Sequence, residues 1–115
     1  MTEANKAVFR QYIEMWNTGN VILADEVLAA NYRDHAHPEV TGADSVKQSM
    51  LKVRESFPDF HITIDQIIGQ GELVAVRAII RRTQQGKENI SRVMWFVRVE
   101  DGKMVDLWTG TEAPS

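Results

Sequence analysis

The sequence predicts an α+β protein in which helices come first and an antiparallel sheet follows. Apolar residues recur at helical spacing over roughly the first half of the chain and alternate with polar residues over the second half. Short Gly-containing segments, "GQGE", "QQGKE" and "EDGK", separate the alternating stretches, as turns do in a meander. With 115 residues, the chain has the usual size of one domain, so we expect a single domain over residues 1–115.

Three helices are expected in the first half. Thr2 can cap a helix whose apolar side chains recur at helical spacing as far as Trp16, before "NTGN" stops it. Asn20 can cap a shorter helix over "VILADEVLAA", residues 21–30. After a short β-like stretch, "NYRDH", the segment "ADSVKQSMLKVRESF" predicts a third helix that ends before Pro58.

Four strands are expected in the second half, over residues 60–68, 73–83, 89–99 and 103–109. The stretches "LVAVRAII" and "VMWFVRV" are apolar in both alternating sets, which indicates burial on both faces. Three short helices can cover only one face, so we expect the other face to meet a second copy in a homodimer. The alternative is a monomer in which the stems of Arg77 and Arg98 cover that face.

Composition excludes several classes of function. The net charge is −3 and the Lys and Arg residues are scattered, so we expect no nucleic-acid partner. The absence of Cys excludes disulfides and thiolate metal sites. No apolar run of about 18 residues occurs, and no apolar segment follows a basic start. We therefore expect a cytoplasmic protein without a membrane partner.

The stretch "YRDHAHPEVTG", residues 32–42, concentrates candidate catalytic and metal-binding groups. His35 and His37, with Asp34 or Glu39, could offer ligands to zinc, but a zinc site needs a further ligand at a distance. His61 is the remaining histidine and belongs to the polar face of an outer strand. We therefore expect no metal, which leaves a proton-transfer site or an ordinary polar loop.

Several segments together resemble the SnoaL-like polyketide cyclase family of the nuclear transport factor 2-like superfamily. They are "YIEMWNTGN", "YRDHAHPEVTG", "FPDFHITIDQII", "LVAVRAII" and "EDGKMVDLW", and they span nearly the whole chain. The resemblance implies a cone-shaped, curved antiparallel sheet wrapped around the N-terminal helices, the cystatin-like α+β roll, with an apolar pocket open at one end. Members include isomerases, dehydratases, cyclases, epoxide hydrolases and non-catalytic domains, so the fold does not fix the chemistry.

The resemblance also suggests catalytic residues. Tyr12 matches the tyrosine with which ketosteroid isomerases of this superfamily polarise a carbonyl. Their base would fall at Ala36 and their second acid at Trp95, so both carboxylates are missing. Asp34 and His35 remain, and adjacent strand residues point to opposite faces, so one of them should enter the pocket. We choose His35, because the family usually has "DH" here; the alternative is a histidine that fixes the loop to a helix end.

Aromatic residues are the expected lining of the pocket. We assign ligand binding to Trp16, Phe57, Trp95 and Trp108 and expect Trp16 or Trp95 to face a cavity, although large aromatics also fill small cores. Near the end of the chain, Asp106 shares its alternation with Trp108 but does not match a family acid firmly.

The expected function is binding of a small apolar molecule without a cofactor. The sequence favours an isomerase, cyclase or hydrolase of this family that uses His35 or Asp34 as base and Tyr12 as hydrogen-bond donor. The alternative is a non-catalytic small-molecule-binding or dimerisation domain with the same fold.

Overall fold

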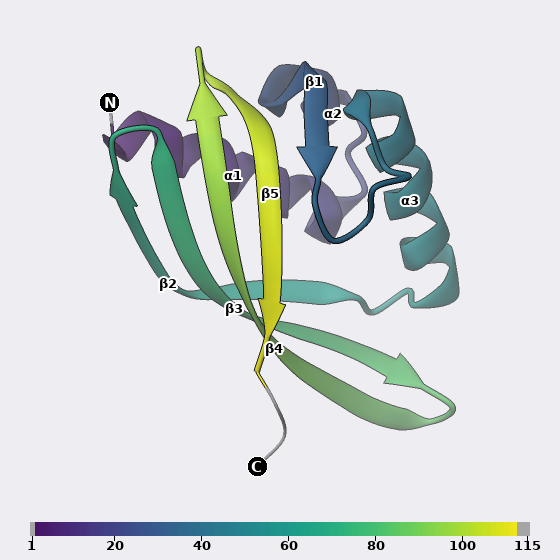
Figure 1. Cartoon of the computed structure of the whole chain (residues 1–115). Coiled ribbons are helices and arrows are strands. Elements are labelled where there is room, and N and C mark those ends of the chain that lie inside the picture. The colour runs from purple at the N-terminus through teal and green to yellow at the C-terminus, as the bar shows by residue number, and fades with distance from the viewer. Residues whose placement is uncertain (1, 113–115) are drawn as a thin grey trace.

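A curved sheet of five strands wraps around three helices in the computed structural model, which describes residues 2–112 (Figure 1). The helices are α1 (Thr2–Thr18), α2 (Ile22–Val27) and α3 (Gly42–Ser56). The strands are β1 (Leu28–Asp34), β2 (His61–Gln70), β3 (Leu73–Gln84), β4 (Lys87–Glu100) and β5 (Lys103–Thr111). No helix in the described range is long and apolar enough to cross a membrane.

The sheet has the strand order β1-β5-β4-β3-β2 and does not close. Strands β2 to β5 form the expected antiparallel meander, and β1 is added at its edge, parallel to β5. The predicted fold class is therefore confirmed, with the refinement that the sheet is mixed. A parallel edge is possible because β1 and β5 are distant in sequence and need no tight turn between them.

The second helix is shorter than the sequence predicted. We expected it to extend to residue 30, but it ends at Val27 and β1 begins at Leu28. Leu28 has an extended backbone and pairs with Met104 of β5, and both side chains are buried. Sheet pairing thus overrides the helix propensity of "LAA".

The core lies between the helices and the face of the sheet that they cover, here called the inner face. Phe9 and Met15 of α1, Met50 of α3 and Tyr32 of β1 are fully buried there. Along β4 the alternation is regular: Val93, Trp95 and Val97 are buried, whereas Met94 and Phe96 lie on the opposite, outer face and are about half exposed. One set of strands therefore builds two very different surfaces.

Strands β3 and β4 continue as a two-stranded arm beyond their neighbours (Figure 1). The two strands pair as far as Gln84 and Lys87, whereas β2 stops pairing at Arg81. The turn uses Gln85 and Gly86, both with positive φ, as a tight two-residue hairpin loop requires. At the base of the arm, the Thr83 backbone N–H donates to Asp59 Oδ1 at 3.0 Å. This contact ties the arm to the loop before β2.

Candidate functional site

A cavity of about 350 Å³ opens on the inner face of the sheet. Residues of α1, of α3, of all five strands and of the loop after β1 line it, and most of them are apolar. Besides the hydroxyl of Tyr12, the cavity is lined by six polar or charged side chains, namely Asp34, His37, Glu39, Ser49, Arg82 and Thr109. An apolar cavity with a few polar groups is the usual form of a small-molecule site.

Two of the four aromatic residues assigned to ligand binding line this cavity. Trp16 and Trp95 both belong to its wall; we expected at least one of them to face a cavity. Phe57 does not belong to the lining, and instead lies under the guanidinium of Arg82, with Cζ 5.0 Å from the ring centroid. Trp108 lies on the outer face, where it is 40% exposed and borders a separate groove.

Tyr12 reaches the cavity from α1 and is almost completely buried. Burial raises its pKa to about 12, and the nearby carboxylate of Asp34 also acts in this direction. Tyr32 is close to Tyr12, but its buried hydroxyl has no hydrogen bond of good geometry to any residue in the range 2–112. At neutral pH Tyr12 is therefore a protonated phenol that can donate a hydrogen bond in the cavity.

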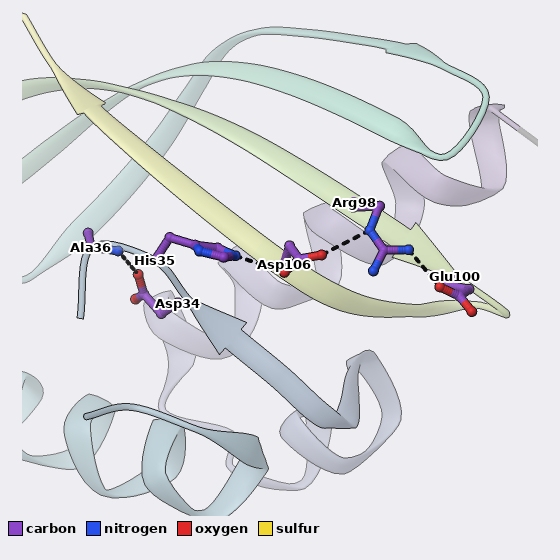
Figure 2. A network of polar contacts seen from close by, with 6 residues as sticks. All are labelled: Asp34, His35, Ala36, Arg98, Glu100 and Asp106. Atoms are coloured by element: carbon purple, nitrogen blue, oxygen red, sulfur yellow. Dashed lines mark hydrogen bonds and ion pairs between the residues drawn. The ribbon is translucent and has the colours of Figure 1, made fainter. Parts of the chain in front are cut away.

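Asp34 ends β1 and lines the cavity. Its Oδ1 accepts a hydrogen bond from the backbone N–H of Ala36 at 3.0 Å (Figure 2), which forms an Asx turn at the end of the strand. The backbone N–H of His37 donates to the Asp34 carbonyl at 3.1 Å. The first contact holds the carboxylate and the second holds the backbone at the start of the loop. Asp34 Oδ2 has no hydrogen bond within residues 2–112, so it is available to a ligand.

His35 does not line the cavity, which corrects the expectation that His35, rather than Asp34, enters the pocket. Its Nε2 donates to Asp106 Oδ1 at 2.8 Å (Figure 2). Its ring stacks on Trp108, with the ring centroids 4.6 Å apart. Its backbone N–H donates to Leu107 at 2.9 Å. The expectation that only one of the two neighbours enters the pocket agrees with this placement. His35 fixes the loop, although to β5 and not to a helix.

Asp106 is the centre of a polar network on the outer face (Figure 2). Besides His35, it accepts a hydrogen bond from Arg98 Nε at 2.9 Å, and Arg98 also pairs with Glu100 at 2.6 Å. Burial alone would raise the pKa of Asp106, but the hydrogen bonds from His35 and Arg98 outweigh it and lower that pKa overall. The side chains of this network therefore satisfy one another's hydrogen bonds.

His37 and Glu39 lie at the exposed end of the cavity. His37 Nδ1 is 3.6 Å from Glu39 Oε1, and both side chains are more than half exposed. Over the part of the chain that the structure describes, no three His, Asp or Glu side chains come together in a way that could hold a metal ion.

Arg82 is a cavity residue that the sequence analysis missed. It lies on β3 two positions after Ile80, and both line the cavity. Its Nε is buried and has no hydrogen-bond partner among the described residues. The alternation of residues along this strand could have identified Arg82, because a strand that turns Ile80 inward also turns residue 82 inward.

Comparisons with solved structures agree with this fold. A candidate polyketide cyclase from Bacillus cereus is 22% identical, with a TM-score of 0.85 over 95% of this chain and 74% of that one. IdmH from Streptomyces antibioticus, also described as a candidate polyketide cyclase, is 23% identical, with a TM-score of 0.80 over 94% and 91% of the chains. TsrD from Streptomyces laurentii is 17% identical, with a TM-score of 0.84 over 96% and 89%.

At these identities the likeness shows the fold alone. No protein with a curated description matches the sequence. The family comparison is more direct, because the model of the SnoaL-like domain matches residues 9–107, which is most of the chain. The cavity, the curved sheet and this match lead to one conclusion: the chain belongs to the SnoaL-like family.

Proposed function

We propose that the protein is a cofactor-independent isomerase or cyclase that acts on a small, partly apolar carbonyl compound in the inner cavity. Asp34 is the general base and Tyr12 the hydrogen-bond donor to the carbonyl oxygen. The observation that carries the proposal is that these two side chains line the same apolar cavity. The candidate polyketide cyclases of the same fold support it.

The proposed step moves one proton. Asp34 removes a proton from the carbon next to the carbonyl, and the electron pair of the C–H bond becomes the new C=C bond while the carbonyl electrons move to oxygen. The Tyr12 hydroxyl donates to the enolate oxygen. Isomerisation follows if protonated Asp34 returns the proton to a different carbon. Ring closure follows if the enolate carbon attacks a second carbonyl and that oxygen takes the proton.

The environment of Tyr12 suits this role. Because its pKa is raised to about 12, the phenol stays neutral and donates to the enolate without losing its proton. Apolar walls around the pair weaken dielectric screening, so a hydrogen bond to developing charge is stronger there than in water. The donor and the base together are expected to accelerate enolisation by several orders of magnitude.

Exchange of hydrogen for deuterium next to a carbonyl tests this proposal without knowledge of the natural substrate. The probe is a panel of small cyclic and aryl ketones, such as 2-tetralone, followed by proton NMR in D₂O. The wild-type protein should exchange at least one ketone faster than buffer does. Tyr12→Phe should slow the exchange by about 10- to 1,000-fold, because it keeps the ring and removes the donor.

Two results would contradict the proposal. The first is a wild-type rate equal to the buffer rate for ketones that calorimetry shows to bind; that result favours the non-catalytic binding domain. The second is exchange that persists in Asp34→Asn. His37→Gln is the matched control, because His37 lines the exposed end of the same cavity and has no role in the proposed step.

We propose further that a second copy of the chain covers the outer face of the sheet. Several large apolar side chains are exposed there and surround a groove of about 520 Å³; they include Ile68, Met94, Phe96 and Trp108. Contiguous exposed apolar surface of this kind is uncommon in monomers. A two-fold axis would place the same patch of two copies face to face.

Analytical ultracentrifugation at micromolar concentration tests the dimer. Phe96→Asp should raise the dissociation constant by about thirtyfold or more, because it buries a charge at the centre of the patch. Ile22→Asp is the control, since Ile22 is also a large exposed apolar residue but lies on α2 and does not line the groove. A wild-type protein that sediments as a monomer would contradict this proposal.

A further inference from the structure

Arg82 is the cationic side chain in the wall of the inner cavity, and its surroundings are unusual for an arginine. Its guanidinium lies over the Phe57 ring, with Cζ 5.0 Å from the centroid. Its Nε is buried and has no hydrogen-bond partner within residues 2–112. One face of the group thus rests on an aromatic ring while a donor remains unused beside the cavity.

Other arginines of the sheet differ from Arg82 in this respect. Arg77 pairs with Asp65 at 3.4 Å and Arg98 with Asp106 at 2.9 Å. A buried donor without a partner costs free energy, and the cost is larger for a charged group. Arginine does not escape this cost by losing its proton. Among the described residues no acceptor faces Arg82 Nε, so an acceptor on a bound molecule would remove this cost.

We propose that Arg82 binds the carboxylate of an acidic ligand in the inner cavity. The planar guanidinium offers parallel N–H groups that fit a carboxylate, and the Phe57 ring beneath it holds its plane in place. This inference identifies the class of ligand for the proposed function. It rests on that function in one respect, because it takes the inner cavity as the ligand site.

The distribution of charge in the cavity orients such a ligand. Asp34 and Glu39 lie on β1 and the loop after it, whereas Arg82 lies on β3, and β5 and β4 separate β1 from β3 in the sheet. A carboxylate is repelled from the two acids and attracted to Arg82. The acid end of the ligand therefore binds at β3, and its neutral carbonyl portion is directed toward Asp34 and Tyr12. A molecule that contacts both ends spans the cavity.

Calorimetric titration with a matched pair of probes tests the inference. The probes are 2-naphthoate and 2-naphthamide, which have nearly the same shape and differ in charge. The wild-type protein should bind the carboxylate about tenfold or more tightly than the amide, as expected for a charge-assisted pair in a partly buried site. Added salt should reduce that preference.

Variants of Arg82 test whether this side chain causes the preference for the carboxylate. Arg82→Gln should abolish the preference for the carboxylate and leave the affinity for 2-naphthamide within about twofold. Arg82→Lys should restore part of it, because charge returns without the planar geometry. Arg81→Gln is the matched control: Arg81 is the preceding residue of the same strand, is exposed and does not line the cavity. It should keep the full preference.

The outcomes also separate this inference from the catalytic proposal. Asp34→Asn should stop ketone exchange and leave the preference for 2-naphthoate intact, so a protein that prefers the acid but never exchanges a ketone contradicts the catalytic proposal alone. Equal binding of the two probes to the wild type, binding of neither, or an equal loss in Arg81→Gln and Arg82→Gln would overturn the Arg82 site. Ketone exchange could survive each of these three results.

Discussion

The inner and outer faces of the sheet are built from alternate residues of the same strands, yet their polar side chains differ in how far they are hydrogen-bonded within the protein. On the outer face, His35, Asp106 and Arg98 satisfy one another through short hydrogen bonds. On the inner face, and among residues 2–112, Arg82 Nε has no acceptor and the Asp34 carboxylate accepts only the local turn contact from Ala36. Titratable residues that already have partners stabilise the fold, whereas those left without partners are available to a ligand.

Asp34 and His35 show the contrast most sharply, because they are neighbours in sequence. The largest expected effect is on the rate of ketone exchange: Asp34→Asn should lower it by about 10²- to 10⁴-fold, and His35→Gln should leave it within about threefold. Exchange is measured by NMR and stability by thermal denaturation. His35→Gln should instead cost about 1 kcal/mol of stability, since it weakens the contacts with Asp106 and Trp108. Reversed effects would mean that the two faces have been assigned the wrong way round.

Two phenylalanines sharpen the comparison in terms of packing. Phe9 is fully buried against the inner face and Phe96 is 48% exposed on the outer face. Phe9→Ala should reduce the free energy of unfolding by about 3–5 kcal/mol, because it leaves a cavity in the core. Phe96→Ala should cost about 1 kcal/mol or less in the monomer. Urea denaturation at a protein concentration too low for dimerisation measures the free energy of unfolding of both variants. Equal losses of stability in the two variants would contradict the division into two faces.

The smallest effect concerns the charges of the outer face. Asp106→Asn should destabilise the protein by about 1–3 kcal/mol near pH 7. Because the folded-state pKa of Asp106 lies below its ordinary value of 3.8, its contribution is complete above that value and is lost as the pH falls through the folded-state pKa. The stability difference between wild type and variant should therefore shrink in acid below about pH 4. A difference that stays constant down to pH 2 would exclude this origin.

Periodicity was sufficient to predict most of the fold. The strands "LVAVRAII" and "VMWFVRV" and the helix that carries Phe9 and Tyr12 follow from local alternation, which the tertiary structure preserves. Strand β1 was predicted too short, because its first residue, Leu28, pairs with Met104 of β5, which is distant in sequence. No local pattern carries that information.

The site was predicted less completely, for a related reason. Alternation correctly implied that Asp34 and His35 diverge, but which of them turns inward depends on the register of β1 against β5. Arg82 was missed because its importance comes from an absent partner, and Trp108 was placed in the pocket because an aromatic side chain does not reveal which face it occupies. The missing partner of Arg82 and the face that Trp108 occupies are both properties of the assembled sheet.

The parallel pairing of β1 with β5 also has a consequence for the order of events during synthesis. More than half of the described chain lies between these two strands, so their contact is among the most non-local in the molecule and is entropically costly to form early. On the ribosome, the helices and the β2–β3 hairpin can form while β5 is still unsynthesised. The end of β1, with Asp34 and the loop that follows, acquires its final position only after β5 emerges. The cavity is thus completed last, so an incomplete chain would have its core helices before it had a binding site.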